Sequence, residues 1–266
     1  MGGEAFAVGG ECGGGECGGA DVHALAEFDK RLRLLCLYAV ESVELAVRVA
    51  IAHHLGRFDP EAHLHQRLLD GRFVQPGPHG EPSAHERWLV RYRRMLADSR
   101  EDFVLHHVHV YGGRLPIWVA VELWDFGMLS RFFAGMEYRD RQRLAVQFGA
   151  VSGEVMRSWL RAFNFVRNVA AHHARLWNRR SPDIPVLPPV DRCRWLASLH
   201  DHPDATSKMF GLLSCLLVMM RSIQPGSEWP DQLTAHWRTF PSSPLVTVAA
   251  AGFPPDWSTL PLWGDG

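Results

Sequence analysis

The chain has 266 residues, of which 47% are hydrophobic and 21% charged, and its formal net charge is -1. This composition is typical of a globular protein with a buried core, and the small net charge excludes a global basic field, so any nucleic-acid site must be a local patch. No segment is long and apolar enough to span a bilayer and no signal peptide is evident, so we expect a cytoplasmic protein without a membrane partner. The 5 cysteines lack regular spacing, which argues against a disulfide framework.

The first part of the chain predicts a glycine-rich segment followed by helices. Residues 1–20 are dominated by glycine and cannot bury enough apolar surface to offset their ordering entropy, so we expect disorder there. Residues 21–266 are interpreted as one all-α domain. Within it, apolar residues at spacings of three and four predict a long amphipathic helix from Asp21 to about Leu55. A loop is expected over 71–82, and one broken helix or two short ones over 84–109.

The middle of the chain predicts several short helices. Pro116 is suited to the first turn of a helix, which we expect over Ile117–Phe126. Gly127 is expected to interrupt this helix, and Leu129–Phe133 to continue it. Another short amphipathic helix is expected over Arg139–Phe148.

The last part of the chain predicts one long helix, a linker and three shorter helices. Ser152 is placed to act as the N-cap of a helix that starts at Gly153. Prolines between residues 182 and 189 end this helix and predict an extended linker. The further helices are expected over Asp191–His200, Thr206–Ile223 and Ser227–Phe240. Because alternating strand patterns are scarce, the chain as a whole predicts an all-α fold.

The sequence RNVAAHHARLWNR, which begins at Arg167, carries the densest polar chemistry and is predicted to be helical. An ideal helix advances ~100° per residue, so Asn168, His172 and Arg175 form one polar stripe. Arg167 lies ~140° from His172 on this geometry, so its side chain must curl toward the histidine or a partner helix must complete the site. His173 points ~100° away from His172.

These residue types can cleave RNA without a metal. A base removes the proton of the 2′-hydroxyl, a cation stabilises the crowded phosphorus, and an acid protonates the leaving 5′ oxygen. Imidazole suits the proton transfers because its reference pKa is ~6.5, and guanidinium matches two phosphate oxygens at once. DNA lacks the nucleophile, so the chemistry implies RNA.

Structural interpretations compete with this one. An arginine and a histidine on a helix are more often a surface ion pair and a hydrogen-bonded ring, and Arg175 with Trp177 and Asn178 could simply close the helix end. The cluster His106-His107-His109 is interpreted as surface histidines. We therefore predict no metal site and no cofactor.

Four blocks of the chain, in order, resemble the bacterial abortive-infection family typified by AbiD and AbiF. The first block is Phe28-Asp29-Lys30-Arg31-Leu32-Arg33 with Ala39-Val40-Glu41-Ser42-Val43-Glu44 and Arg48; the second is Leu115-Pro116-Ile117-Trp118-Val119 with Glu122, Phe126-Gly127 and Leu129-Ser130; the third is Arg167-Asn168, Ala171-His172-His173 and Arg175-Leu176-Trp177-Asn178; the last is Gly252-Phe253-Pro254 with Trp257. The resemblance covers roughly residues 25–263, and four ordered blocks are more specific than one short motif.

This resemblance implies a HEPN-like all-α helical bundle with additional C-terminal helices. Many HEPN proteins are metal-independent endoribonucleases that act in phage defence or as toxins, and some AbiF-like ones pair with a small noncoding RNA. The resemblance implies Arg167 and His172 as the catalytic pair and Asn168 as a supporting residue, with His173 as an alternative or supporting imidazole. In such proteins the motif is typically assembled at a dimer interface, so we predict a homodimer with its motif helices facing each other.

Three functions therefore remain open from the sequence. The first is an endoribonuclease that leaves 2′,3′-cyclic phosphate ends. The second is a noncatalytic RNA-binding protein in which Arg167, Arg175, Arg179 and Arg180 hold phosphates. The third is a helical interaction scaffold in which the motif is structural.

Overall fold

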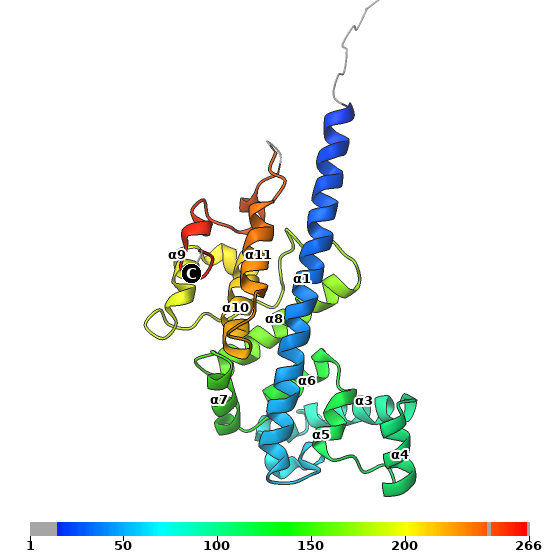
Figure 1. Cartoon of the computed structure of the whole chain (residues 1–266). Helices are drawn as coiled ribbons and strands as arrows, with labels where there is room; N and C mark the ends of the chain where they lie inside the picture. The colour runs from blue at the N-terminus through cyan, green and yellow to red at the C-terminus, as the bar shows by residue number, and fades with distance from the viewer. Residues whose placement is uncertain (1–14, 244–245, 265–266) are drawn as a thin grey trace, which may run out of the picture.

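A computed structural model describes residues 15–243 and 246–264, and these residues form an all-α fold, as predicted. Across these ranges no strand forms. The α-helices are α1 (Gly15–Gly56), α2 (Gly71–Val74), α3 (Ala84–Asp98), α4 (Asp102–Tyr111), α5 (Ile117–Ala120), α6 (Phe126–Gly135), α7 (Tyr138–Gln147), α8 (Gly153–Ala171), α9 (Ala197–Asp201), α10 (Met209–Ile223) and α11 (Trp229–Arg238). Figure 1 shows α1 as the axis of the molecule, with α3 to α6 around its C-terminal part and α9 to α11 beside its middle.

Helix α1 is the long amphipathic helix that the spacing predicted. It buries one apolar stripe, from Phe28 through Val43 to Leu55, against the other helices. The helix begins at Gly15, so the predicted start at Asp21 is too late. Adding a residue to an existing helix costs far less than nucleating one, which explains how a glycine-rich run can continue it. The expectation of disorder falls partly on residues 1–14, which lie outside the described residues.

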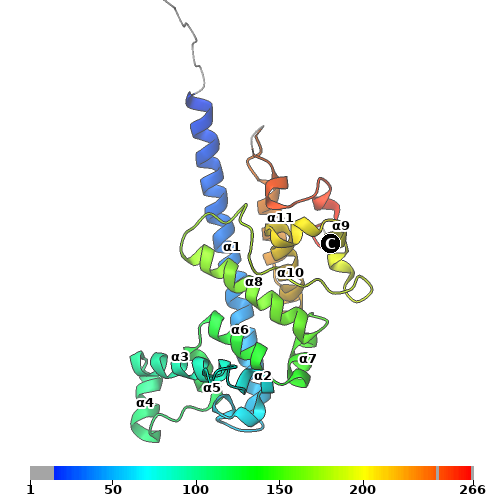
Figure 2. The ribbon, with the colours of Figure 1, turned by 180° about the vertical axis from the view of Figure 1, so that it is seen from behind.

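Helix α8 crosses α1 on the back of the molecule, as Figure 2 shows, and it packs against α1, α6 and α7. Helix α10 covers both α1 and α8, and every residue from Met209 to Met220 is buried. A helix that is apolar all round belongs in the core of a domain. None of the described helices combines the length and apolarity that crossing a bilayer demands.

The predicted helix over Ile117–Phe126 is wrong in its extent. Trp124 adopts an extended conformation, and the side chain of Asp125 accepts a hydrogen bond from the amide of Met128 at 2.8 Å. Aspartate is among the best N-cap residues, so a new helix, α6, starts at Phe126. The break therefore comes before Phe126, and Gly127 lies inside α6 rather than between two helices.

The predicted loop over 71–82 is also partly wrong, because its first residues form the short helix α2. Asp70 caps this helix by accepting a hydrogen bond from the amide of Arg72 at 2.9 Å. The expected break within 84–109 is confirmed by α3 and α4. The predicted N-cap at Ser152 is confirmed by its hydrogen bond from the amide of Val155 at 3.2 Å.

The C-terminal part packs onto the body of the fold. Residues 182–189 contain no helix, as their prolines predicted, and the helix expected over 191–200 is reduced to α9 and a preceding 3₁₀ turn. Phe253 packs against Trp237 with ring centroids 4.1 Å apart. A single cluster of buried apolar side chains extends from Phe28 to Trp263, so the tail shares the core of the helical bundle.

Candidate active site

The motif does not lie on one continuous helix. Helix α8 ends at Ala171, and its last carbonyls accept hydrogen bonds from the amides of His173, to Ala170 at 3.1 Å, and of Ala174, to Val169 at 3.1 Å. This pair of bonds is a Schellman C-cap, which reverses the chain direction. The predicted helical stripe therefore includes Asn168 and ends at His172, because Arg175 lies beyond the turn.

His173 occupies the position of this cap that favours glycine. Its φ is 55°, and it is the single non-glycine residue with positive φ in the described ranges. A side chain with a Cβ costs roughly 1 to 2 kcal/mol in this left-handed conformation. Unusual backbone conformations of this kind cluster at functional sites. The chain thus carries an imidazole where glycine would be more stable.

Both histidines of the motif present open imidazole rings. His172 and His173 are exposed, and neither ring has a hydrogen-bond or ion-pair partner within residues 15–243 and 246–264. Two uncommitted imidazoles are therefore available to solvent and to a ligand at the C-terminal end of α8.

Arg167 lies near the C-terminal end of α8 and is half-buried. Its guanidinium makes a long contact of 3.4 Å with Oδ1 of Asn168. On the α1 side it lies close enough to the carboxyl of Glu44 to lower that group's pKa, although burial dominates and raises the pKa overall. Glu44 also pairs with Arg48 at 2.5 Å, and Arg48 donates to the carbonyl of Trp124 at 2.5 Å. A network of α1 side chains therefore holds the environment of the motif arginine.

Asp29 of α1 fixes the chain on the other side of the turn. Its Oδ1 accepts hydrogen bonds from the amides of Leu176, at 2.9 Å, and of Trp177, at 2.7 Å, while Oδ2 pairs with Arg33. Asp29 is only 4% exposed, and a buried carboxylate must be paired in this way. The indole of Trp177 is buried against Phe240. The segment from His172 to Arg175 is thus held at both ends.

From the sequence alone we assigned no role to Asp29 or Glu44, although both lie in the first block that resembles the family. A signal was available for Asp29, because it falls on the apolar stripe of α1 directly after Phe28 and before Leu32. A charged residue at a core position predicts a buried partner, but not which segment supplies it.

The three arginines predicted to bind RNA differ in their surroundings. Arg175 and Arg179 are exposed, and neither has a partner in the described part of the chain. Arg180 instead forms a two-pronged ion pair with Asp204, at 2.9 and 3.1 Å, which lowers the pKa of that carboxyl to about 2. Arg180 is thus already engaged by a carboxylate, whereas the other two can bind an anion without losing a partner.

The other groups with metal-binding or nucleophilic chemistry lie outside this region. Among the residues that the structure describes, no three His, Cys, Asp or Glu side chains are arranged to hold a metal ion. His107 on α4 bonds to the carbonyl of Phe103 at 2.8 Å. Cys36 and Cys215 are buried free thiols whose pKa values are raised by burial. Cys12 lies outside the described residues, and the side chain of Cys17 is not described.

The sequence profile of the family described as Abi-like protein matches residues 17–178, which is more than half of the 266 residues. The chain belongs to the Abi-like protein family. The match includes Asp29, Glu44 and the whole motif up to Asn178, whereas the C-terminal block that resembles the family lies outside it. No curated protein and no solved structure matches the chain.

Membership of the Abi-like family connects the protein with abortive infection, in which bacteria resist phage. The matched region ends where Asp29 ties down the chain after the motif. Within it, Arg167 and His172 are five positions apart, which on an ideal helix is a rise of ~7.5 Å and a rotation of ~140°. The two side chains therefore start from different faces, and a shared ligand requires the Arg167 side chain to curl toward His172 or a partner helix to complete the site.

Proposed function

We propose that this Abi-like protein is a metal-independent endoribonuclease that acts as a phage-defence or toxin effector. The observation that carries the proposal is the end of α8, where two open imidazoles follow a half-buried arginine five and six positions along the chain. The ion pairs and hydrogen bonds of α1 hold this region in place without engaging the imidazoles. Groups that act on a substrate must be positioned by their neighbours and yet free to bind.

The reaction follows from the roles that these groups can play. His172 accepts the proton of the 2′-hydroxyl, whose oxygen then attacks the adjacent phosphorus. Arg167 stabilises the extra negative charge on the phosphate oxygens, with Asn168 as a further polar contact. The bond to the 5′ oxygen breaks, and an imidazolium donates its proton to that oxygen. The products are a 2′,3′-cyclic phosphate and a 5′-hydroxyl, so the protons balance over the step.

The proton for the 5′ oxygen comes either from His173 or from an imidazole of a second copy of the chain.

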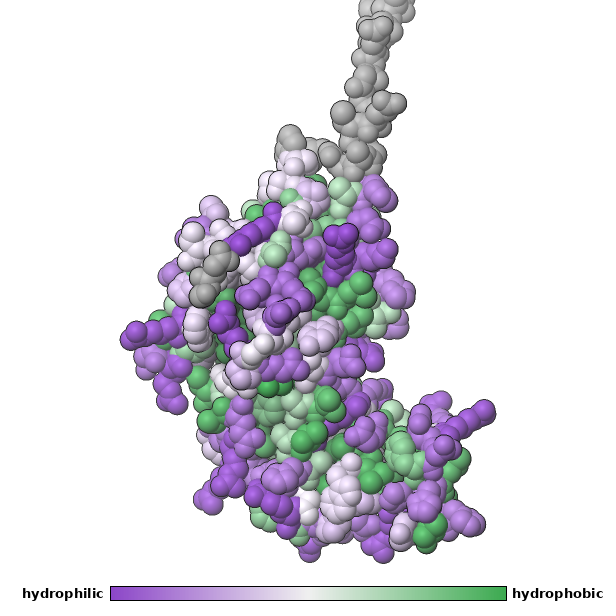
Figure 3. Space-filling model, viewed as in Figure 1, coloured by the Kyte–Doolittle hydropathy of each residue, from purple (hydrophilic) through white to green (hydrophobic). Residues whose placement is uncertain are grey.

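We propose a homodimer with the two motif helices facing each other. In support, an exposed apolar stripe on α1 is formed by Leu34, Tyr38, Leu45 and Val49. Hydrophobic side chains also interrupt the hydrophilic surface in the view of Figure 3. Exposed apolar patches of this kind mark interaction surfaces.

The position of this stripe connects it with the motif. On a helix that advances ~100° per residue, the stripe is bordered by Glu44 and Arg48, and the carboxyl of Glu44 lies close to Arg167. A copy docked on the stripe would therefore sit beside the motif arginine. Light scattering at assay concentration tests this part, since an active monomer contradicts the dimer. A small noncoding RNA partner stays a prediction.

The decisive experiment measures RNA cleavage in EDTA by protein that has been stripped of copurifying RNA. We expect the wild type to leave 2′,3′-cyclic phosphate ends, and we expect Arg167→Ala and His172→Ala to lower the rate by at least a hundredfold, the scale of one general acid–base group. His79→Ala, which removes an exposed loop histidine, is the matched control. Equal rates for His172→Ala and the wild type would remove the catalytic role.

A noncatalytic RNA-binding protein is the second candidate, and the uncommitted Arg175 and Arg179 favour it. In that case RNA affinity would survive His172→Ala, would fall steeply with salt, and no cleavage would occur. Growth arrest on expression separates the RNase from a helical scaffold. An RNase effector loses toxicity with His172→Ala, whereas a scaffold is equally toxic, or equally harmless, in both forms.

A further inference from the structure

A second basic site lies at the opposite end of α8. A cavity of about 730 Å³ opens among α2, α3, α6, α7 and the first turns of α8. Its charged side chains are five arginines and two carboxylates, namely Arg72, Arg87, Arg131, Arg141, Arg157, Asp70 and Glu154. The pocket thus holds an excess of three positive charges in a chain whose formal net charge is -1. A local concentration of this kind attracts anions.

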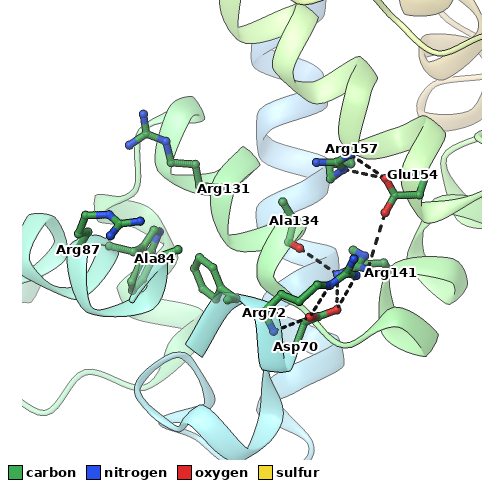
Figure 4. A pocket seen from close by; sticks show the side chains of 11 residues that line it. Asp70, Arg72, Ala84, Arg87, Arg131, Ala134, Arg141, Glu154 and Arg157 are labelled. Carbon is green, nitrogen blue, oxygen red and sulfur yellow. Dashed lines mark hydrogen bonds and ion pairs between the residues drawn. The ribbon is translucent and has the colours of Figure 1, made fainter. Parts of the chain in front are cut away.

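The carboxylates occupy only one side of the pocket. Asp70 pairs with Arg72 at 3.2 Å and with Arg141 at 3.4 Å, and Glu154 pairs with Arg157 at 2.8 Å. Figure 4 shows these groups opposite Arg87 and Arg131.

Arg87 and Arg131, on the other side, have no carboxylate partner among residues 15–243 and 246–264. Arg87 donates to the carbonyl of Pro82, and Arg131 has no partner within the described ranges. Both are exposed at the surface of the cavity. Their guanidinium groups can therefore take a ligand without breaking an ion pair.

Arg141 is the buried member of the pocket, with a side chain only 2% exposed. One terminal nitrogen donates to the carbonyls of Ala134, at 2.9 Å, and Met136, at 2.5 Å. Its Nε is buried and makes no hydrogen bond within the described part of the chain. A buried guanidinium in the wall of a basic cavity adds a positive charge that solvent screens little, which favours an anionic ligand. Guanidinium groups suit phosphate because their donors match two oxygens.

A polar stripe on α8 joins this pocket to the motif. Arg157, Arg161, Asn164, Asn168 and His172 follow one another at spacings of four, three, four and four residues. On an ideal helix they fall within an arc of ~80°, and none of them is buried. The rise from Arg157 to His172 is ~22 Å. At 3.4 Å per nucleotide of a stacked strand, this corresponds to roughly six nucleotides.

We propose that the arginine pocket binds phosphates of the RNA strand whose scissile bond lies at His172. The inference rests on the proposed function, because it places both sites on one substrate. The pocket makes the enzyme dependent on substrate length. A strand that spans only the scissile bond reaches the motif alone, while a longer strand also reaches Arg87 and Arg131.

The test compares RNA oligomers of about three and about twelve nucleotides, lengths chosen below and above the span of the stripe. Binding is measured with the His172→Ala protein, which separates affinity from cleavage. Arg87→Ala/Arg131→Ala is the pocket variant, and both residues are exposed, so folding should be retained. Arg94→Ala/Arg143→Ala removes the same charge from exposed positions outside the pocket and is the control.

We expect the pocket variant to bind the longer strand at least tenfold more weakly. The slope of log affinity against log salt should fall by roughly 0.7 for each lost phosphate contact on a single strand. The control and the shorter strand should show little change, and lysine at both positions should restore part of the affinity. In the cleaving protein, KM for the longer strand should rise in the pocket variant while the rate constant for the shorter strand is unchanged.

Unchanged affinity of the pocket variant for the longer strand would overturn the proposal. If the wild type also binds a free nucleoside triphosphate through Arg87 and Arg131 while RNA affinity stays the same, the pocket serves a soluble nucleotide instead. Absence of cleavage together with pocket-dependent RNA binding would reject the nuclease and leave the phosphate site standing. The failures of the two proposals are therefore distinguishable.

Discussion

The two ends of α8 are built on different physical principles. At the N-terminal end, around Arg141, most charges are paired or bonded to carbonyls, and one guanidinium is fully buried. At the C-terminal end, His172 and His173 are open, and the backbone of His173 is in the left-handed region. The first end resembles a preformed binding pocket. The second end keeps two imidazoles uncommitted, while Asp29 fixes the chain that follows them.

This difference shows where the fold supplies rigidity to the motif. The imidazoles have no hydrogen-bond partner among the residues that the structure describes, so their position depends on the bonds that Asp29 makes to the amides of Leu176 and Trp177. The pocket, by contrast, contains its own support in Asp70 and Arg141. We therefore expect a single supporting substitution to disturb the motif end more strongly than the pocket end.

The largest effect is expected for Asp29→Ala. The substitution removes the buried carboxylate that accepts hydrogen bonds from the amides of Leu176 and Trp177, and it leaves Arg33 without its partner. Breaking a buried charged pair typically costs about 3 to 5 kcal/mol, which urea unfolding would measure. Glu27→Ala is the control, since Glu27 makes an exposed pair with Lys30, and exposed pairs contribute about 1 kcal/mol or less. If Asp29→Ala lowers the free energy of unfolding by less than about 1 kcal/mol, the Schellman turn at His173 is stable without Asp29.

At the pocket end, a smaller effect should appear as a pH dependence. Hydrogen bonds from Arg72 lower the pKa of the Asp70 carboxyl to about 2, whereas an unfolded aspartate titrates near ~3.9. The folded state therefore binds the proton less readily. Its stabilisation is fully present above the unfolded pKa and is lost as the pH falls from about 4 toward about 2.

We expect this contribution to be about 1 to 2 kcal/mol, because Arg72 is exposed and solvent screens the pair. Urea unfolding of the wild type and of Asp70→Asn between pH 5 and pH 2 measures it. The two proteins should converge in stability as the pH falls. If the free energies of unfolding of the two proteins instead differ by the same amount at every pH, the arginines do not lower the pKa of Asp70.

Sequence patterns predicted the helices well where a strong periodic signal coincided with capping residues. The spacing of Phe28 and Leu32 predicted α1, and Ser152 predicted the start of α8. The break at Asp125 was missed because apolar residues continue on both sides of it, and the cap competes with helix continuation only through one hydrogen bond. The formation of a short helix such as α2 likewise depends on a single capping side chain.

The site was predictable in composition but not in geometry. The residues after Ala171 read as further helix, since alanine, arginine and leucine all favour that state. The Schellman turn at His173 has no glycine to announce it. Contacts between distant segments, such as Asp29 with Trp177, cannot be read from local spacing. The arginine pocket was missed for the same reason, because its side chains come from five separate helices or turns.

The smallest predicted effect distinguishes the two histidines of the motif. Replacing His173 with glycine relieves the left-handed backbone, so His173→Gly should stabilise the protein by about 0.5 to 1 kcal/mol. His173→Ala keeps the Cβ and is the matched control, with a stability close to that of the wild type. If RNA cleavage by His173→Gly stays near the wild-type rate, His172 is the active imidazole and the strain is incidental. If cleavage falls with both variants while stability rises only for glycine, the unfavourable backbone is retained because the reaction uses the His173 ring.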